Sequence, residues 1–286
     1  MTALAIGLAL AAAAIHGTWN VLVKVSGDPM GTFRRGTVVA AAVVTPITFV
    51  VWLFAGRPSI MPAAAGLAAL SALFELMYLV LLSAAYNRGE LSVVYPIARG
   101  SAPLLSVAAG LGLLGERLTP GQMAGVALLL LGILAVTLPQ TSGRATVPAL
   151  LTGVSIAAYS AVDRVGVRLS TPWLYGWLLI VLLAIGVVTW GWVVSKLHTP
   201  DTPSERQGQP VRWRQATVIG IFMWGGYLLV LAALSIAPLS VVAPVRETAI
   251  VAVAVWGVWK LRERKGVALK LLGASATLIG VALLAF

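Results

Sequence analysis

The sequence predicts an all-α integral membrane protein in which ten transmembrane helices form two inverted five-helix repeats around a central cavity. Three observations predict this fold: the composition is too apolar for a soluble domain, the chain divides into ten long apolar runs, and its second half repeats motifs of its first half. Polar and apolar residues do not alternate within the runs, so the runs fit helices and not the strands of a membrane barrel.

The composition indicates a lipid environment. Hydrophobic residues make up 59% of the 286 residues and charged residues only 10%, whereas soluble domains carry about 25% charged residues. The net charge is +11, and most basic residues lie in short connectors between apolar runs, which is typical of contact with anionic lipid headgroups and not of nucleic-acid binding. The chain has no cysteine, which excludes disulfides, thiolate metal sites and cysteine nucleophiles.

Each apolar run is long enough to cross a hydrocarbon core about 30 Å thick as a helix. The first run lacks the basic start of a signal peptide and continues past Trp19, so it is predicted to be the first span. The long polar connector from Lys196 to Arg214 is predicted to be a solvent-exposed loop. The predicted spans are residues 2–23, 36–55, 62–86, 91–114, 120–138, 146–167, 173–195, 214–236, 239–259 and 266–286.

The chain carries an internal duplication. Leu-Ser-Val-Val-Tyr-Pro at residues 91–96 returns as Leu-Ser-Val-Val-Ala-Pro at residues 239–244, and Glu116 returns as Glu263. The offset of 148 residues at the prolines and 147 at the glutamates is close to half of the chain, which indicates two copies of one unit. Because each copy has an odd number of spans, the second must enter the membrane from the opposite side, as in transporters with inverted repeats. The predicted repeats are residues 1–143 and 144–286.

The distribution of basic residues favours one orientation. Connectors after odd-numbered spans hold thirteen Lys and Arg residues, and connectors after even-numbered spans hold four. Basic connectors tend to be cytoplasmic, so this count places both termini outside.

Several motifs resemble those of the drug/metabolite transporter superfamily, specifically its ten-span EamA-type branch. They are His-Gly-Thr-Trp-Asn at residues 16–20 with Lys24, Tyr-Pro-Ile-Ala-Arg-Gly at 95–100, Leu-Gly-Glu-Arg at 114–117 and Pro-Val-Arg-Glu-Thr at 244–248. The resemblance covers essentially the whole chain and extends to bacterial amino acid exporters of that family. It implies a multi-pass protein of the bacterial inner membrane that exports small metabolites. It also implies cytoplasmic termini, which conflicts with the charge count.

Ionisable residues deep inside a span are costly, so they are expected to face a cavity or one another. Those found here are His16, Glu75, Arg99, Arg246 and Glu247. Arg99 and Glu247 each lie eight residues into their runs, or about 12 Å deep, so both fall near the midplane, and the repeat alignment matches them. Two interpretations stay open: buried pairs that hold helices together, or a cavity in which an arginine binds a carboxylate and a glutamate receives an ammonium group.

Further residues are candidates for the same site. Glu75 is the best candidate for proton coupling, because a buried carboxyl can load and release a proton, and the alternative is a hydrogen-bonded structural acid. His16 could serve likewise, or could instead be a hydrogen-bond donor in helix packing. The aromatic residues Trp19, Tyr78, Trp224 and Tyr227 fall well inside their spans, where rings either line a cavity for large apolar groups and cations or belong to interfacial belts.

Two prolines lie at matching positions, Pro96 and Pro244, six residues into their runs. Each removes a backbone hydrogen bond just before the charged residues, so they are candidate hinges as well as candidate static kinks. No metal-ligand spacing, Walker-type phosphate loop or convergent acid–base cluster is found in the sequence, so no metal, cofactor or catalytic residue is predicted and the protein is not expected to be an enzyme.

The predicted function is secondary transport by alternating access: export of small zwitterionic metabolites, above all amino acids, including aromatic and hydrophobic ones. The alternative is export of organic cations, drugs or other small metabolites, and a more distant one is a membrane enzyme or lipid scramblase. The expected partners are a small-molecule substrate, protons as a candidate coupling ion, and the lipid bilayer, with no nucleic acid and a monomer as the working assembly.

Overall fold

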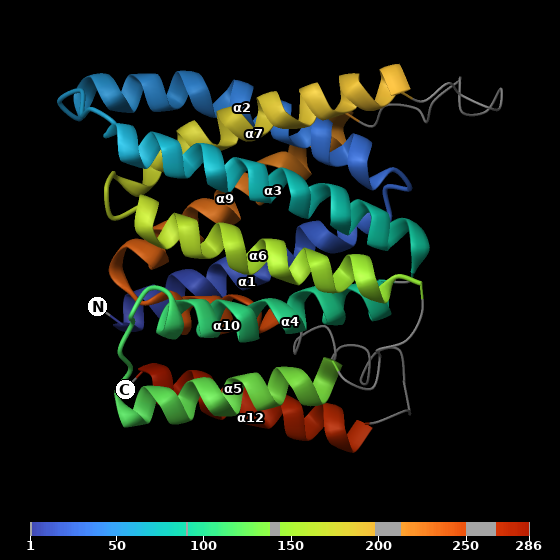
Figure 1. Cartoon of the computed structure of the whole chain (residues 1–286), viewed down its shortest axis with the longest axis vertical. Coiled ribbons are helices and arrows are strands. Elements are labelled where there is room, and N and C mark those ends of the chain that lie inside the picture. Colours follow the sequence, from blue (N-terminus) through green and yellow to red (C-terminus); the bar gives the residue numbers. More distant parts are fainter. Residues whose placement is uncertain (1, 90, 138–143, 198–212, 250–266, 286) are drawn as a thin grey trace.

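The computed structural model describes residues 2–89, 91–137, 144–197, 213–249 and 267–285 (Figure 1). Within these residues the regular elements are all helices, so the prediction of an all-α fold is confirmed. The helices are α1 (Thr2–Lys24), α2 (Pro29–Phe54), α3 (Pro62–Arg88), α4 (Leu91–Gly112), α5 (Pro120–Thr137), α6 (Thr146–Gly166), α7 (Pro172–Leu197), α9 (Trp213–Ile236), α10 (Leu239–Arg246) and α12 (Val267–Ala285).

Local signals in the sequence fix several helix ends. The Asp28 carboxylate caps α2 by accepting the N–H of Gly31 at 2.8 Å, which satisfies one of the free donors of the first turn. The ammonium group of Lys24, at the end of α1, donates to the carbonyl oxygens of Tyr86 and Gly89 at 2.6 and 2.9 Å. These carbonyls belong to the last turn of α3 and its cap, so Lys24 ties α1 to α3.

The ninth predicted span, residues 239–259, differs from the structure. The helix α10 covers only Leu239–Arg246 and contains Pro244, which has no N–H to donate. After α10 ends, the N–H groups of Glu247 and Thr248 donate to carbonyl oxygens three residues back, at 3.1 and 3.2 Å. The α-helical hydrogen-bond pattern is therefore replaced by tighter turns. The predicted span is therefore interrupted at Glu247, shortly after Pro244, where the sequence predicts a kink or a hinge, and residues 250–259 lie outside the described part of the chain.

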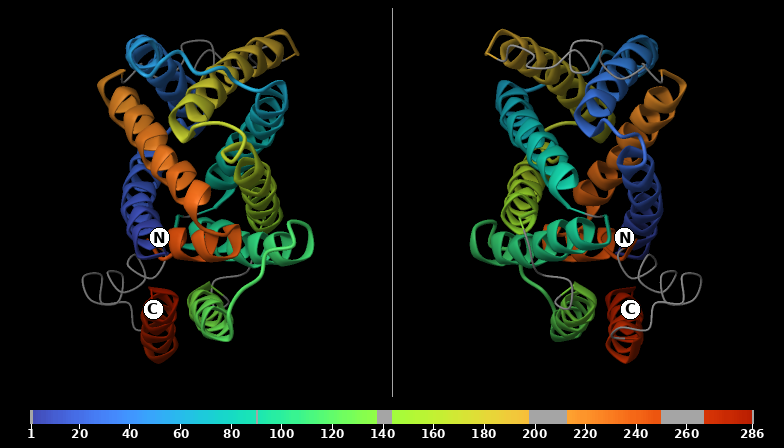
Figure 2. Two further views of the ribbon diagram at one scale, coloured as in Figure 1. Left: turned by 90° about the vertical axis from the view of Figure 1, so that its left-hand side faces the viewer. Right: turned by 90° about the vertical axis from the view of Figure 1, so that its right-hand side faces the viewer.

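Helices from the first half of the chain pack mainly on helices from the second half. α5 packs on α12, α4 on α10 and α6, α3 on α6 and α7, α2 on α7 and α9, and α1 on α9 and α10. Figure 1 shows these pairs as successive layers, and Figure 2 shows α5 and α12 side by side in a layer of their own at one edge. In Figure 1, α1 runs opposite to α6, and α2 opposite to α7.

Glu116 connects the segment after α4 to the start of α10. Its carboxylate accepts the backbone N–H groups of Leu239 and Ser240 at 2.7 and 2.9 Å, and the Ser240 hydroxyl at 2.7 Å. Arg164, near the end of α6, donates to the same carboxylate at 3.2 Å. A carboxylate at a helix N-terminus is stabilised by the free N–H groups and by the helix dipole, so Glu116 fixes where α10 begins.

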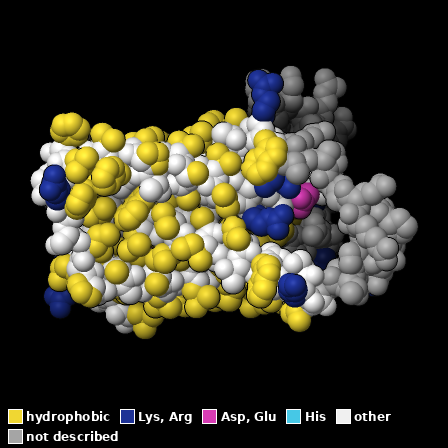
Figure 3. All heavy atoms as spheres, turned by 90° about the horizontal axis from the view of Figure 1, so that it is seen from above, with side chains coloured by type: hydrophobic (Ala, Val, Ile, Leu, Met, Phe, Trp, Pro, Cys, Tyr) yellow, Lys and Arg dark blue, Asp and Glu magenta, His cyan; other side chains and the backbone are white. Residues whose placement is uncertain are grey.

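The surface is apolar where a bilayer would contact it. In the described part of the chain, six helices are long and apolar enough to cross a membrane by length and composition. They are α1, α2, α3, α6, α7 and α9, and α5 and α12 hold shorter apolar stretches. Figure 3 shows hydrophobic side chains across the middle of one face and Lys and Arg side chains at its two ends. The chain is therefore a multi-span membrane protein, and the count of ten spans stays a prediction.

Glycines allow two pairs of helices to approach closely. A Cβ added at Gly125 of α5 would lie 3.0 Å from the carbonyl oxygen of Gly280 of α12, and the reverse substitution would place Cβ 2.7 Å from the carbonyl oxygen of Gly125. A Cβ at Gly220 of α9 would overlap the backbone of Gly36 in α2. In lipid, such close backbone contact replaces the hydrophobic effect as the force between helices.

We predict that Gly220→Ala lowers the thermal unfolding midpoint of the purified protein in detergent, because the added methyl group meets a backbone carbonyl that has no freedom to rotate away. Overpacking of this kind costs about 1–3 kcal/mol. The matched control is Gly225→Ala on the same helix, where an added Cβ meets nothing within 4 Å and alanine favours the helix. Equal midpoints for the two variants would contradict the close contact of α2 and α9.

Candidate functional site

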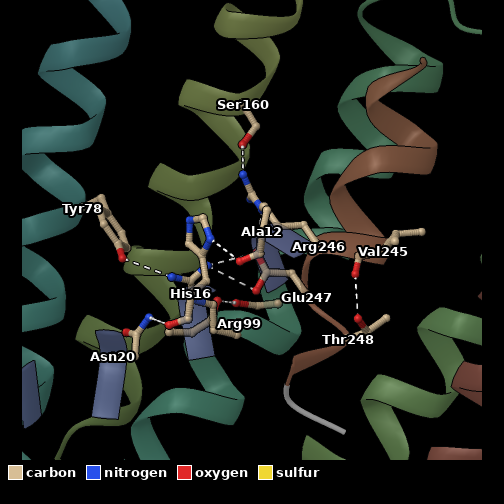
Figure 4. A network of polar contacts seen from close by, with 12 residues as sticks. Ala12, His16, Asn20, Tyr78, Arg99, Ser160, Val245, Arg246, Glu247 and Thr248 are labelled. Atoms are coloured by element: carbon tan, nitrogen blue, oxygen red, sulfur yellow. Dashed lines mark hydrogen bonds and ion pairs between the residues drawn. The ribbon is translucent and has the colours of Figure 1, made fainter. Parts of the chain in front are cut away.

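The buried centre of the molecule holds two arginines and one glutamate in a single ion-pair network (Figure 4). Arg99 Nη1 of α4 donates to both carboxylate oxygens of Glu247, at 3.1 and 3.3 Å. Arg246 Nε donates to Glu247 Oε1 at 3.0 Å. All three side chains are at most 2% exposed, and breaking a buried pair of this kind is strongly destabilising. The two residues that the repeat alignment matches, Arg99 and Glu247, are thus in direct contact.

Aromatic rings surround the two guanidinium groups. Arg99 Nη2 donates to the hydroxyl of Tyr78 at 3.2 Å, and the Arg99 guanidinium lies 5.9 Å from the centre of the Trp19 ring. The Arg246 guanidinium lies 5.9 Å from the centre of the Tyr159 ring. A cation over an aromatic face gains about 0.5–2 kcal/mol, more where water is excluded. The rings therefore stabilise the buried positive charges of the two arginines, which hydrocarbon chains would not do.

Three buried N–H donors around the network lack a hydrogen-bond partner among the described residues. They are Nη2 of Arg246 and the indole Nε1 atoms of Trp19 and Trp224. The other terminal nitrogen of Arg246 is satisfied, since Nη1 donates to Ser160 at 3.3 Å. Leaving a buried donor unpaired costs about 1–3 kcal/mol. A ligand with oxygen acceptors could satisfy these donors.

A cavity of about 50 Å³ lies among α1, α3, α6, α7 and α9. It has room for a few water molecules, whereas binding sites for drug-sized ligands measure about 300–1,000 Å³. Apolar side chains of α7 form much of its wall. The sequence-predicted residues in its lining are His16, Trp19, Glu75, Tyr78, Trp224 and Tyr227. The structure therefore brings these residues together beside the ion-pair network.

The sequence analysis missed a buried acid on α6. Asp163 is fully buried, and its carboxylate accepts the hydroxyls of Tyr175, at 2.7 Å, and of Tyr227. Glu75 of α3 lines the same cavity as Tyr227. Asp163 follows His16 by 147 residues, which is also the offset between the duplicated glutamates. Extending the repeat alignment to the first span would have found it.

Three of the predicted site residues, His16, Pro96 and Pro244, lie within helices near the charged residues. His16 Nδ1 lies 2.7 Å from the carbonyl oxygen of Ala12 within α1, and Pro244 lies inside α10. Pro96 belongs to α4, but its side chain lies outside the description, so the hinge function of both prolines stays a prediction. Within the described ranges, no group of three or more His, Asp and Glu residues is arranged to hold a metal ion.

Long apolar helices with buried charges that meet beside an internal cavity define the class of polytopic membrane transporters. Residues 3–138 of this chain match the EamA-like transporter family. A solved structure titled "Crystal structure of protein" is similar over 99% of this chain and 98% of its own, with a TM-score of 0.68 and 18% identity. At that identity the likeness shows the fold alone. No curated protein matches the chain.

We predict that Glu247→Gln destabilises the protein more than Arg99→Gln does. Glu247→Gln leaves two guanidinium groups without a carboxylate in the network, and an uncompensated buried charge costs about 3–5 kcal/mol. Arg99→Gln leaves the pair between Arg246 and Glu247 intact. Thermal unfolding of both purified variants, in one detergent and at one pH, shows which variant has the lower unfolding midpoint. A lower midpoint for Arg99→Gln would show that another group compensates the charges of the arginines.

Proposed function

We propose that this protein is a secondary transporter of the bacterial inner membrane that exports small zwitterionic metabolites, most of all amino acids with aromatic or hydrophobic side chains. The observation that carries the proposal is that one ring-lined cavity offers unpaired N–H donors and a carboxyl group together. Trp19 and Trp224 supply donors, and Glu75 supplies the carboxyl, all in the cavity lining. A zwitterion has a carboxylate that can accept from the N–H donors and an ammonium group that can pair with the carboxyl group of Glu75.

The two ends of the zwitterion would be bound by different helices. The substrate carboxylate would accept from the indole N–H groups and from Arg246 Nη2, all three of which are unpaired among the described residues. The ammonium group would pair with Glu75, which is 8% exposed and lines the cavity. Charge-assisted hydrogen bonds of this kind are about twice as strong as neutral ones. The side chain of the substrate would lie against the rings and the leucines of α7.

Alternating access would open the cavity to one side of the membrane at a time. The opposite directions of α1 and α6, and of α2 and α7, support the proposal that residues 1–143 and 144–286 are inverted repeats that move against each other. The end of α10 at Arg246 provides a break in the helix next to the charges, and discontinuous helices are typical at transporter sites. Pro96 and Pro244 remain the proposed hinges.

Export of organic cations is the second candidate. It is favoured by the fact that Arg99 is already engaged with Glu247 and Tyr78, while Glu75 faces the cavity. A cation could then bind to Glu75 and the aromatic rings with no help from an arginine.

Counterflow in proteoliposomes tests the proposal against a panel of amino acids, amines without a carboxylate, and sugar phosphates, with and without a pH gradient. We expect aromatic and hydrophobic amino acids to exchange without chemical change. Arg99→Ala and Glu247→Ala are expected to abolish exchange while the proteins still insert, because each breaks the network beside the cavity. Exchange of amines alone would favour the second candidate, and wild-type flux in either stable variant would reject a role of the network in transport.

We predict that Trp19→Phe and Trp224→Phe each weaken binding of an aromatic amino acid roughly tenfold but leave binding of the corresponding amine nearly unchanged. Phenylalanine keeps a ring and removes the N–H, and a hydrogen bond to a charged group contributes about 1.5–3 kcal/mol, against 1.4 kcal/mol for each factor of ten. Trp192→Phe, at an exposed position of α7, is the control. An equal loss for both ligands would show that the indoles act only as packing surfaces.

A further inference from the structure

Two buried carboxyl groups from different helices lie near Tyr227. The Tyr227 hydroxyl donates to Asp163 of α6, and Glu75 of α3 lines the same small cavity as Tyr227. Tyr175 of α7 donates to the other Asp163 oxygen at 2.7 Å. Asp163 is 0% exposed and Glu75 is 8% exposed, so neither carboxyl group is solvated by bulk water.

The single hydroxyl hydrogen of Tyr227 limits how many of the carboxyl groups of Glu75 and Asp163 can be ionised. An ionised carboxylate only accepts, and a tyrosine hydroxyl has one hydrogen to donate. With that hydrogen given to Asp163, the Tyr227 oxygen has only lone pairs left for Glu75. Glu75 therefore makes a hydrogen bond to Tyr227 only if it carries a proton and donates it.

The charges of the buried side chains also indicate that the carboxyl groups of Glu75 and Asp163 hold one proton between them. The buried ionisable side chains other than tyrosine in the described part are His16, Glu75, Arg99, Asp163, Arg246 and Glu247. With the histidine neutral, two arginines and three carboxylates carry one excess negative charge, and an uncompensated charge inside an apolar bundle is costly. One proton on the carboxyl groups restores neutrality. The two guanidinium groups beside His16 would repel a positive charge there, which leaves the carboxyl groups to hold it.

We propose that Glu75 and Asp163 share a single proton through the hydroxyl of Tyr227. In the transfer step Glu75 gives its proton to the Tyr227 oxygen while the Tyr227 hydrogen passes to Asp163. One O–H bond breaks and one forms at Tyr227, Glu75 becomes the carboxylate and Asp163 the acid, and the total charge does not change. The other ionisable groups that face the pair are His16, Tyr78, Tyr159, Tyr175 and Arg246.

The relay leads from the middle of the bundle toward one of its ends. Glu75 lies midway along α3, and Asp163 lies three residues before the end of α6 at Gly166. Figure 1 places that end of α6 on the side where α1 begins. If the proposed function holds, the ammonium group of a substrate that binds Glu75 would drive the proton across Tyr227 to Asp163, so that substrate binding and protonation of Asp163 are linked.

Infrared spectroscopy of the ligand-free protein in a detergent without ester groups tests the shared proton. We expect the carbonyl stretch of one protonated carboxyl group at neutral pH in the wild type. We also expect that Glu75→Gln and Asp163→Asn each abolish it, because either substitution removes the excess negative charge and leaves the Tyr227 hydrogen for the remaining carboxylate. No such band in the wild type, or a band that persists in either variant, would overturn the proposal.

Control variants separate the relay from its surroundings. Tyr227→Phe should keep the band, because the charges are unchanged, but shift it, because the bridging hydroxyl is lost. His16→Gln should leave the band in place, and loss of the band there would assign the proton to a different network. Size-exclusion profiles and circular dichroism establish that each variant is folded before its spectrum is interpreted.

A second measurement connects the relay to transport and distinguishes its failure from failure of the proposed function. The amino acid with the strongest counterflow should shift the band in the wild type but not in Tyr227→Phe. If no member of the panel is transported, the proposed function fails while the ligand-free spectra still decide the shared proton. If an amino acid is transported but the band is absent, the proposed function stands and the shared proton is wrong.

Discussion

The structure depends on one requirement: the charges of Arg99, Arg246 and Glu247 must be compensated inside a bundle that excludes water. The two hydrogen bonds from Arg99 to Glu247 join α4 to the turn after α10, and the Arg246 contact to the same carboxylate fixes that turn from within. Because a buried charge without a partner costs more than most single packing contacts contribute, the position of α10 follows from the position of Arg99.

The depth of a charge in an apolar run was enough to predict part of this site. Arg99 and Glu247 lie equally deep in matching runs, and the structure places them in contact. Asp163 escaped because it lies near the end of its run, where an acid is ordinary, and because Tyr175 and Tyr227, which bind it, belong to other helices. Contacts between helices far apart in sequence leave no periodic signal within a single run.

Hydropathy also left two structural points undetermined. Apart from Arg246, Glu247 and a few small polar residues, residues 239–259 are apolar, so average hydropathy does not mark the end of α10 after Arg246, which lies next to Pro244 and the paired charged side chains. Depth placed Trp19 well inside its span but could not tell whether its ring lines a cavity or belongs to an interface, because depth does not tell which helix face points inward. The Trp19 side chain is 2% exposed and lines the cavity.

The helix α10 is held at both of its ends by residues of the α4 segment. Glu116, in the connector after α4, caps the first N–H groups of α10, and Arg99 binds the carboxylate that follows its last turn. A helix of eight residues has few backbone bonds of its own, so these two carboxylate contacts carry much of its stability. Movement of the second half against the first must therefore either carry α4 and α10 together as one body or break one of the two contacts. The side chain of Glu116 is 7% exposed and those of Arg99 and Glu247 are 2% exposed, so separation at either end of α10 would leave a buried carboxylate without its partners, which is costly.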